Sequence, residues 1–191
     1  AATLSESQAG NNIMHYTLPS LVDDLTVAVS YTPAGANDES SSAFGLTYAG
    51  VEGLSVSYGQ GSADGDAAGS GGTAANSDTT SMKASYAIGS FTLAYSDHDH
   101  DSNTDTSDQT ATSWKVSYTV SDAVSVTYGT ESIDSKGTAD TSDAEYTKIT
   151  ASHTSGGMTV SANYQEATEM SYTTATDEDE EYVGLSVSFA F

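Results

Sequence analysis

Hydrophobic and polar residues alternate along most of this 191-residue chain. The segment Leu25–Tyr31 runs Leu-Thr-Val-Ala-Val-Ser-Tyr, and the same period of two returns in Trp114–Tyr118 and Val183–Phe191. Successive side chains of a β-strand point to opposite sides, so this period predicts strands that have one apolar face. With two weaker segments at about 11–17 and 144–153, the pattern predicts eleven strands.

The links between the predicted strands alternate sharply in length. Short links are expected at 19–24, 49–53, 87–90, 119–123 and 154–157. Long polar links are expected at 33–42, 60–79, 97–110, 131–143 and 166–180. This order predicts an antiparallel up-and-down sheet with tight turns at one end and long loops at the other. Transmembrane β-barrels have the same asymmetry, with short periplasmic turns and long extracellular loops.

The polar face of the predicted strands carries mostly Ser, Thr, Ala and Gly. In a soluble β-sandwich, the alternative fold, the outward face usually carries many charged side chains. A small and mostly uncharged polar face instead suits a wall around a water-filled lumen. We therefore predict an all-β fold class, with residues 1–191 forming one transmembrane antiparallel up-and-down β-barrel portion. A secreted acidic β-protein remains the weaker alternative.

Aromatic residues on the apolar face fall into two groups once strand direction is assigned. Those toward the long-loop ends of the strands are Tyr31, Tyr58, Tyr95, Tyr128 and Tyr164. Those toward the short-turn ends are Tyr48, Tyr86, Tyr118, Phe189 and Phe191. Transmembrane barrels carry such aromatic girdles at their two membrane interfaces. The two groups are therefore predicted to mark the upper and lower edges of a membrane.

Composition removes several classes of function. The chain has 27 Asp and Glu residues against 4 Lys and Arg, a formal charge of −23, and no Cys. So few basic residues cannot neutralise a phosphate backbone, which argues against nucleic acid as a partner. The absence of Cys excludes disulfides, thiolate zinc sites and thiol nucleophiles. No nucleophile-elbow motif of the form Gly-x-Ser-x-Gly occurs, and we predict that the chain is not an enzyme.

The alternation assigns Lys83, Lys115 and Lys148 to the polar face. A lysine in contact with lipid at the middle of a bilayer costs about 2–4 kcal/mol, so a lumen position is the expected one. The acidic residues instead concentrate in the long links, including the run 177–181. We predict pore-lining lysines below an acidic mouth that attracts cations at low salt.

One acidic link has the spacing of a calcium-binding loop. Its carboxylates occupy positions 1, 3, 5, 9 and 12 of an EF-hand-like segment, namely Asp97, Asp99, Asp101, Asp105 and Asp108. The sixth position is Ser102 rather than glycine, and the twelfth is Asp rather than the longer Glu. Calcium is therefore a candidate ligand, and no other cofactor is expected. An ordinary solvated acidic loop is the alternative that stays open.

The two ends of the chain carry a family resemblance. The final strand Tyr182–Phe191 ends on phenylalanine after alternating apolar residues, and resembles the C-terminal assembly signal of Gram-negative outer-membrane proteins. The segment Ile13–Tyr31 resembles the hairpin that follows the constriction loop in general-diffusion porins of the sixteen-stranded trimeric family. The resemblance implies that the eleven strands are strands 6–16 of such a porin. The N-terminal strands and the constriction loop would then lie outside this chain.

The resemblance also implies a function and partners. We expect an outer-membrane porin that lets small hydrophilic solutes and ions diffuse through a water-filled barrel. Its expected partners are outer-membrane lipid, lipopolysaccharide, the missing N-terminal porin segment and two further copies in a homotrimer. By the same resemblance His15 lies near a basic wall residue of the family, and is predicted to line the pore. The alternative is a structural or adhesion barrel whose acidic extracellular loops bind divalent cations or a partner.

Overall fold

The chain is described by a computed structural model, which places residues 13–19, 22–34, 40–64, 76–102, 108–136, 142–172 and 179–190. The strands are β1 (Met14–Thr17), β2 (Leu25–Thr32), β3 (Ser41–Tyr48), β4 (Leu54–Ala63), β5 (Ser77–Ile88), β6 (Phe91–Ser102), β7 (Gln109–Ser121), β8 (Val124–Ser135), β9 (Ala144–Ser155), β10 (Met158–Thr168) and β11 (Glu180–Phe189). No helix in these ranges is long and apolar enough to cross a membrane.

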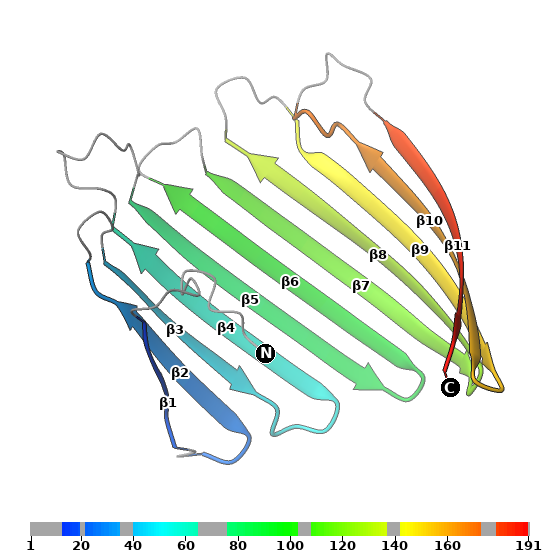
Figure 1. The fold of residues 1–191 in the computed structure, drawn as a ribbon, viewed down its shortest axis with the longest axis horizontal. Helices are drawn as coiled ribbons and strands as arrows, with labels where there is room; N and C mark the ends of the chain where they lie inside the picture. Colours follow the sequence, from blue (N-terminus) through cyan, green and yellow to red (C-terminus); the bar gives the residue numbers. More distant parts are fainter. Residues whose placement is uncertain are drawn as a thin grey trace.

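The strands form one sheet in sequence order, and every neighbouring pair is antiparallel (Figure 1). The short turns lie together at one end of the sheet. At the turn between β9 and β10, Gly156 and Gly157 have φ angles of 56° and 82°. A two-residue hairpin turn of this kind needs positive φ at both residues, which glycine adopts without strain. The predicted eleven-stranded up-and-down order is confirmed.

Several strands extend further toward the long links than the sequence predicted. β6 continues to Ser102 and β7 begins at Gln109, so the link predicted at 97–110 is shorter than expected. β8 likewise continues through Ile133 to Ser135. Both faces of a barrel strand meet water once the strand leaves the lipid, so the apolar alternation ends before the strand does. The predicted boundary at Asp97 marks the edge of the apolar band rather than the end of the strand.

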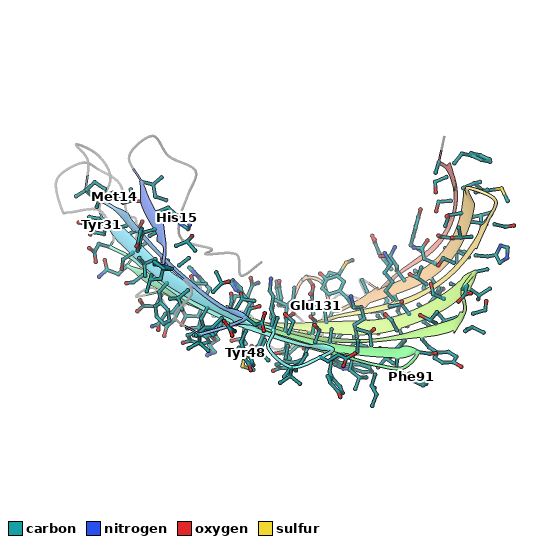
Figure 2. The ribbon with its side chains drawn as sticks, turned by 90° about the horizontal axis from the view of Figure 1, so that it is seen from below. Met14, His15, Tyr31, Tyr48, Phe91 and Glu131 are labelled. Carbon is teal, nitrogen blue, oxygen red and sulfur yellow. The ribbon has the colours of Figure 1, made fainter. Side chains whose placement is uncertain are left out.

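The sheet is curved into an open trough, as Figure 2 shows from the end. β1 and β11 form its two edges, and in the described part of the chain each pairs with a single neighbour. Since direction alternates from strand to strand, these two edge strands run the same way. An antiparallel ring therefore needs an odd number of further strands between them.

The trough has almost no conventional hydrophobic core. Ala43 and Ala144 are its only buried hydrophobic residues among those the structure describes. By contrast, Leu93 is 49% exposed and Leu185 is 76% exposed. Each buried leucine side chain stabilises a soluble protein by about 1.5–3 kcal/mol, and that contribution is lost here if the surrounding solvent is water. The pattern fits a sheet whose apolar face is covered by lipid.

Candidate pore wall

The two faces of the trough carry the two halves of the alternating pattern. Figure 2 shows Tyr48 and Phe91 on the convex side, with Met14 and Tyr31 on the outer side of the first edge. His15 and Glu131 lie on the concave side. Side chains alternate along each strand, and residues paired across neighbouring strands share a face. These labelled positions therefore assign all the remaining strand residues to one face or the other. The convex face is apolar, and the concave face is polar.

The three lysines predicted to line a pore all fall on the concave face. Lys83 shares a cross-strand row with Glu131, through two intervening serines. Lys115 and Lys148 lie in the next row toward the turns, on either side of Gly129. The lysines therefore stand on alternate strands, β5, β7 and β9, and form an arc across the wall.

His15 lies apart from the lysines. It is exposed on the first edge strand, and its Nε2 is 3.4 Å from Thr17 Oγ1. It pairs with Ser30 of β2, so it faces the concave side at the loop end of the trough. The lysine arc and His15 are thus separate parts of the wall, and the pore-lining role predicted for His15 stays a prediction.

Hydroxyl groups line much of the remaining concave surface. Ser96 Oγ and Ser113 Oγ are 2.7 Å apart, and Ser125 Oγ and Ser152 Oγ are also 2.7 Å apart. Among described strand residues the only concave carboxylates are Glu131 and Glu180. The chain's large negative charge therefore resides elsewhere, and three lysines face two carboxylates on this wall.

Two hollows lie along the lysine arc. The first, of about 420 Å³, is lined by Lys83, Lys115 and five serines. The second, of about 570 Å³, is lined by Lys115, Lys148 and a mixed set that includes Glu131 and two tyrosines. Lys115 borders both. We call them the serine hollow and the tyrosine hollow.

Aromatic side chains form a belt on the loop side of the convex face. Its predicted members are Tyr31, Tyr58, Tyr95, Tyr128 and Tyr164. Two further residues join them: Trp114 lies 5.3 Å from Tyr128 between ring centroids, and Phe44 lies 5.8 Å from Tyr58. Neither was among the predicted belt residues, although Lys115 on the polar face already required Trp114 to point the other way.

A second belt lies on the turn side of the same face. Its predicted members within the described residues are Tyr48, Tyr86, Tyr118 and Phe189. Phe91 was missed, and its ring stacks on that of Tyr118 with centroids 4.6 Å apart and planes at 26°. Phe191 lies outside the described residues.

The loop-side belt crosses the strand register obliquely. The cross-strand pairing from β2 to β6 places Tyr31 in the same row as Asp101. The belt residue of β6, however, is Tyr95. Barrel strands tilt by about 40° and lie about 4.8 Å apart, which over four strands shifts a level line by roughly five residues. The observed shift of six residues, from 101 to 95, agrees with a level belt on tilted strands.

The predicted calcium-loop carboxylates lie beyond this belt. Asp97 accepts hydrogen bonds from Thr112 Oγ1 at 3.0 Å and Tyr95 Oη at 3.3 Å, and Asp99 accepts one from Thr110 Oγ1 at 2.7 Å. They are followed by Asp101 along the convex side of β6, in an extended strand rather than a loop. Alternate residues of a strand lie about 7 Å apart, so this row does not wrap around one ion.

The other two carboxylates predicted for calcium, Asp105 and Asp108, come after the end of β6 in the sequence. Asp108 Oδ1 accepts a hydrogen bond of 2.7 Å from the Ser102 amide, and Asp105 lies outside the described residues. Within the described ranges no group of three or more His, Asp or Glu residues is arranged to hold a metal ion. Calcium binding by the full set of five stays a prediction.

One comparison with known proteins gives a family match. The family model for Gram-negative porins matches residues 1–191. A search of curated proteins found no match.

Solved structures share the architecture at low identity. An anion-selective porin from Comamonas acidovorans superposes with a TM-score of 0.69 at 17% identity, over 95% of this chain and 60% of that one. OccK10 (OpdN) from Pseudomonas aeruginosa gives 0.65 at 13% identity, over 93% and 61%. A loop-deletion mutant of OmpT, an outer-membrane protein of Vibrio cholerae, gives 0.62 at 16% identity, over 93% and 62%. This chain spans about three fifths of each of these structures.

Proposed function

Because this chain belongs to the Gram-negative porin family, we propose that it forms part of the wall of a passive diffusion channel. Family membership places it in the outer membrane. The observation that carries the proposal is the division of the trough into an apolar, aromatic convex face and a hydroxyl-lined concave face with three lysines. Small hydrophilic solutes and ions would pass along the concave face.

The concave wall supplies the physical means of permeation. Serine and threonine hydroxyls donate and accept hydrogen bonds, and can replace part of the water around a passing solute. The lysine arc places fixed positive charge along the path, in a wall of low dielectric where charges act strongly. Passage is then governed by pore width and by the local field rather than by a conformational cycle.

We further propose that the barrel is closed by strands other than the eleven described. The two edge strands run in the same direction, and bacterial single-chain barrels are antiparallel with an even number of strands. Five additional strands satisfy both conditions and give the sixteen of the general-diffusion porins. Assembly as a homotrimer, in contact with lipopolysaccharide, is part of the same proposal.

Single-channel recording in a planar bilayer tests the proposed function. The complete protein should produce discrete, ohmic conductance steps in potassium chloride, without any energy source. A preparation that is correctly folded by circular dichroism but gives no steps would refute the channel proposal.

A further inference from the structure

The tyrosine hollow is the most elaborate feature of the concave wall. It spans β7 to β11, and the concave strand residues that line it occupy two adjacent cross-strand rows. One row contains Lys115, Gly129, Lys148, Gln165 and Tyr182, and the other contains Glu131, Tyr146, Ala167 and Glu180. Opposite charges, an amide and aromatic rings therefore face one space of about 570 Å³.

The two tyrosines of this hollow lie on a different face from the other strand tyrosines. Every other tyrosine in the described strands lies on the convex face, where the membrane accounts for it. Tyr146 and Tyr182 instead face the concave side, and Tyr182 is 59% exposed. Lipid contact does not explain their position. An aromatic ring exposed on a polar wall offers a flat surface on which a ligand can stack.

The two lysines of the hollow are separated by a position without a side chain. Gly129 lies between them in the row, and a Cβ added there would stand 3.3 Å from the Trp114 carbonyl oxygen and 3.7 Å from Lys115 Cβ. Strands are about 4.8 Å apart, so the lysine backbones are roughly 10 Å apart. Two extended side chains can converge across this gap on one anionic group.

The carboxylates and the amide of the hollow indicate which groups the ligand carries besides its anionic group. Glu131 pairs across the strands with Tyr146, and Gln165 lies between Lys148 and Tyr182. Carboxylates accept hydrogen bonds from hydroxyl groups, and an amide both donates and accepts. An aromatic anion would leave the glutamates as unfavourable neighbours, whereas a polyhydroxylated ring provides donors for them. The C–H face of a sugar ring also stacks on tyrosine.

We propose that the tyrosine hollow is a binding site for a small acidic sugar, a monosaccharide that carries one carboxylate. Lys115 and Lys148 bind the carboxylate, Glu131, Gln165 and Glu180 bind the hydroxyls, and Tyr146 and Tyr182 cover the ring. The inference rests on the proposed channel function, because the ligand reaches this wall through the pore. Binding is weak enough for release, as passage through a channel requires.

Glucuronate is the probe. Two independent measurements test binding to the hollow and conduction through the channel separately. Ligand-observed NMR on the detergent-solubilised complete protein measures binding without any need for conductance. Bilayer recording then measures interruption of the current by glucuronate. Glucose lacks the carboxylate, acetate lacks the ring, and benzoate combines a carboxylate with an aromatic ring. We expect glucuronate to bind at least about tenfold more tightly than each of the three, since charged hydrogen bonds and stacking both contribute.

Matched variants locate the site on the wall. Lys148→Gln should weaken glucuronate binding about tenfold, because it removes one charged partner of the carboxylate. Lys83→Gln changes a lysine of the serine hollow in the same way, and should leave binding within twofold. Tyr182→Ser should weaken binding about fivefold, and Tyr182→Phe, which keeps the ring, should restore most of it.

The outcomes are distinguishable from failure of the channel proposal. If the protein gives no conductance steps, the channel proposal fails, while NMR still tests the hollow. If steps occur but benzoate or glucose binds as well as glucuronate, the acidic-sugar assignment is overturned. Equal effects of Lys83→Gln and Lys148→Gln would overturn the location.

Discussion

The two faces of a single strand, β6, obey different rules. Its convex residues begin with Phe91, Leu93 and Tyr95, whereas its concave residues begin with Thr92, Ala94 and Ser96. The backbone is shared, so the difference is one of solvent. Lipid restricts the convex positions to apolar and aromatic side chains, and water leaves the concave positions free to vary. Stability should therefore depend mainly on one set of alternate residues and permeation on the other.

The largest expected difference comes from placing the same charge on each face. Leu93 lies between the two aromatic belts, and Leu93→Lys should destabilise the folded protein by about 2–4 kcal/mol. Its neighbour Thr92→Lys points to water opposite Ala87 and Ser117, and should cost less than about 0.5 kcal/mol. Urea unfolding in lipid vesicles measures both. Equal losses would mean that the two faces meet the same solvent.

A smaller effect is expected at the turn-side belt. Phe91→Ala removes the stack on Tyr118 and should cost about 1 kcal/mol beyond the lost apolar contact. Thr92→Ala, one residue away on the concave face, is the control and should be nearly neutral. The same unfolding titration applies. A neutral Phe91→Ala would remove the belt as a source of stability.

Ion selectivity should respond to the concave lysines. Lys115→Glu reverses a charge beside both hollows, and should lower the anion-to-cation permeability ratio several-fold because the wall charge acts directly on the path. Lys136→Glu makes the same change just after β8, outside the wall, and should have little effect. Reversal potentials in a salt gradient give the ratio. Equivalent shifts in both variants would assign selectivity to the surface charge as a whole.

The smallest change in stability is expected at the serine pairs of the concave face. Ser125→Ala removes the contact with Ser152, but water in the lumen can replace the lost partner. We expect a change of about 0.5 kcal/mol or less and no change in conductance. A loss above about 1 kcal/mol, measured by the same titration, would indicate that this part of the wall is dry.

The sequence predicted the strand count and the faces of the three strand lysines and of the described belt tyrosines, because a period of two separates lipid-facing from water-facing side chains. The predicted strand ends were wrong where both faces of a strand meet water and the alternation stops. Asp97 to Asp101 look like a loop because both faces of β6 are in water there, yet the strand continues. Phe91 and Trp114 were not predicted as belt members, although the alternation already assigns both to the convex face.

The tyrosine hollow could not be predicted in the same way. Lys115, Gly129 and Lys148 become neighbours only through the register of β7, β8 and β9, and register depends on turn geometry and on the bulge between Thr119 and Ser121. Tyr146 and Tyr182 were not among the predicted site residues, because the sequence alone does not show which charged residues lie beside them.

A cysteine scan distinguishes lipid-facing from water-facing positions one residue at a time, because the chain contains no Cys of its own. Single cysteines at positions 91 to 96 of the complete protein in lipid vesicles would be exposed to a charged, water-soluble thiol reagent. We expect labelling at 92, 94 and 96 and protection at 91, 93 and 95. Labelling without a period of two, or with the opposite phase, would contradict a lipid-facing convex side and a water-filled concave side.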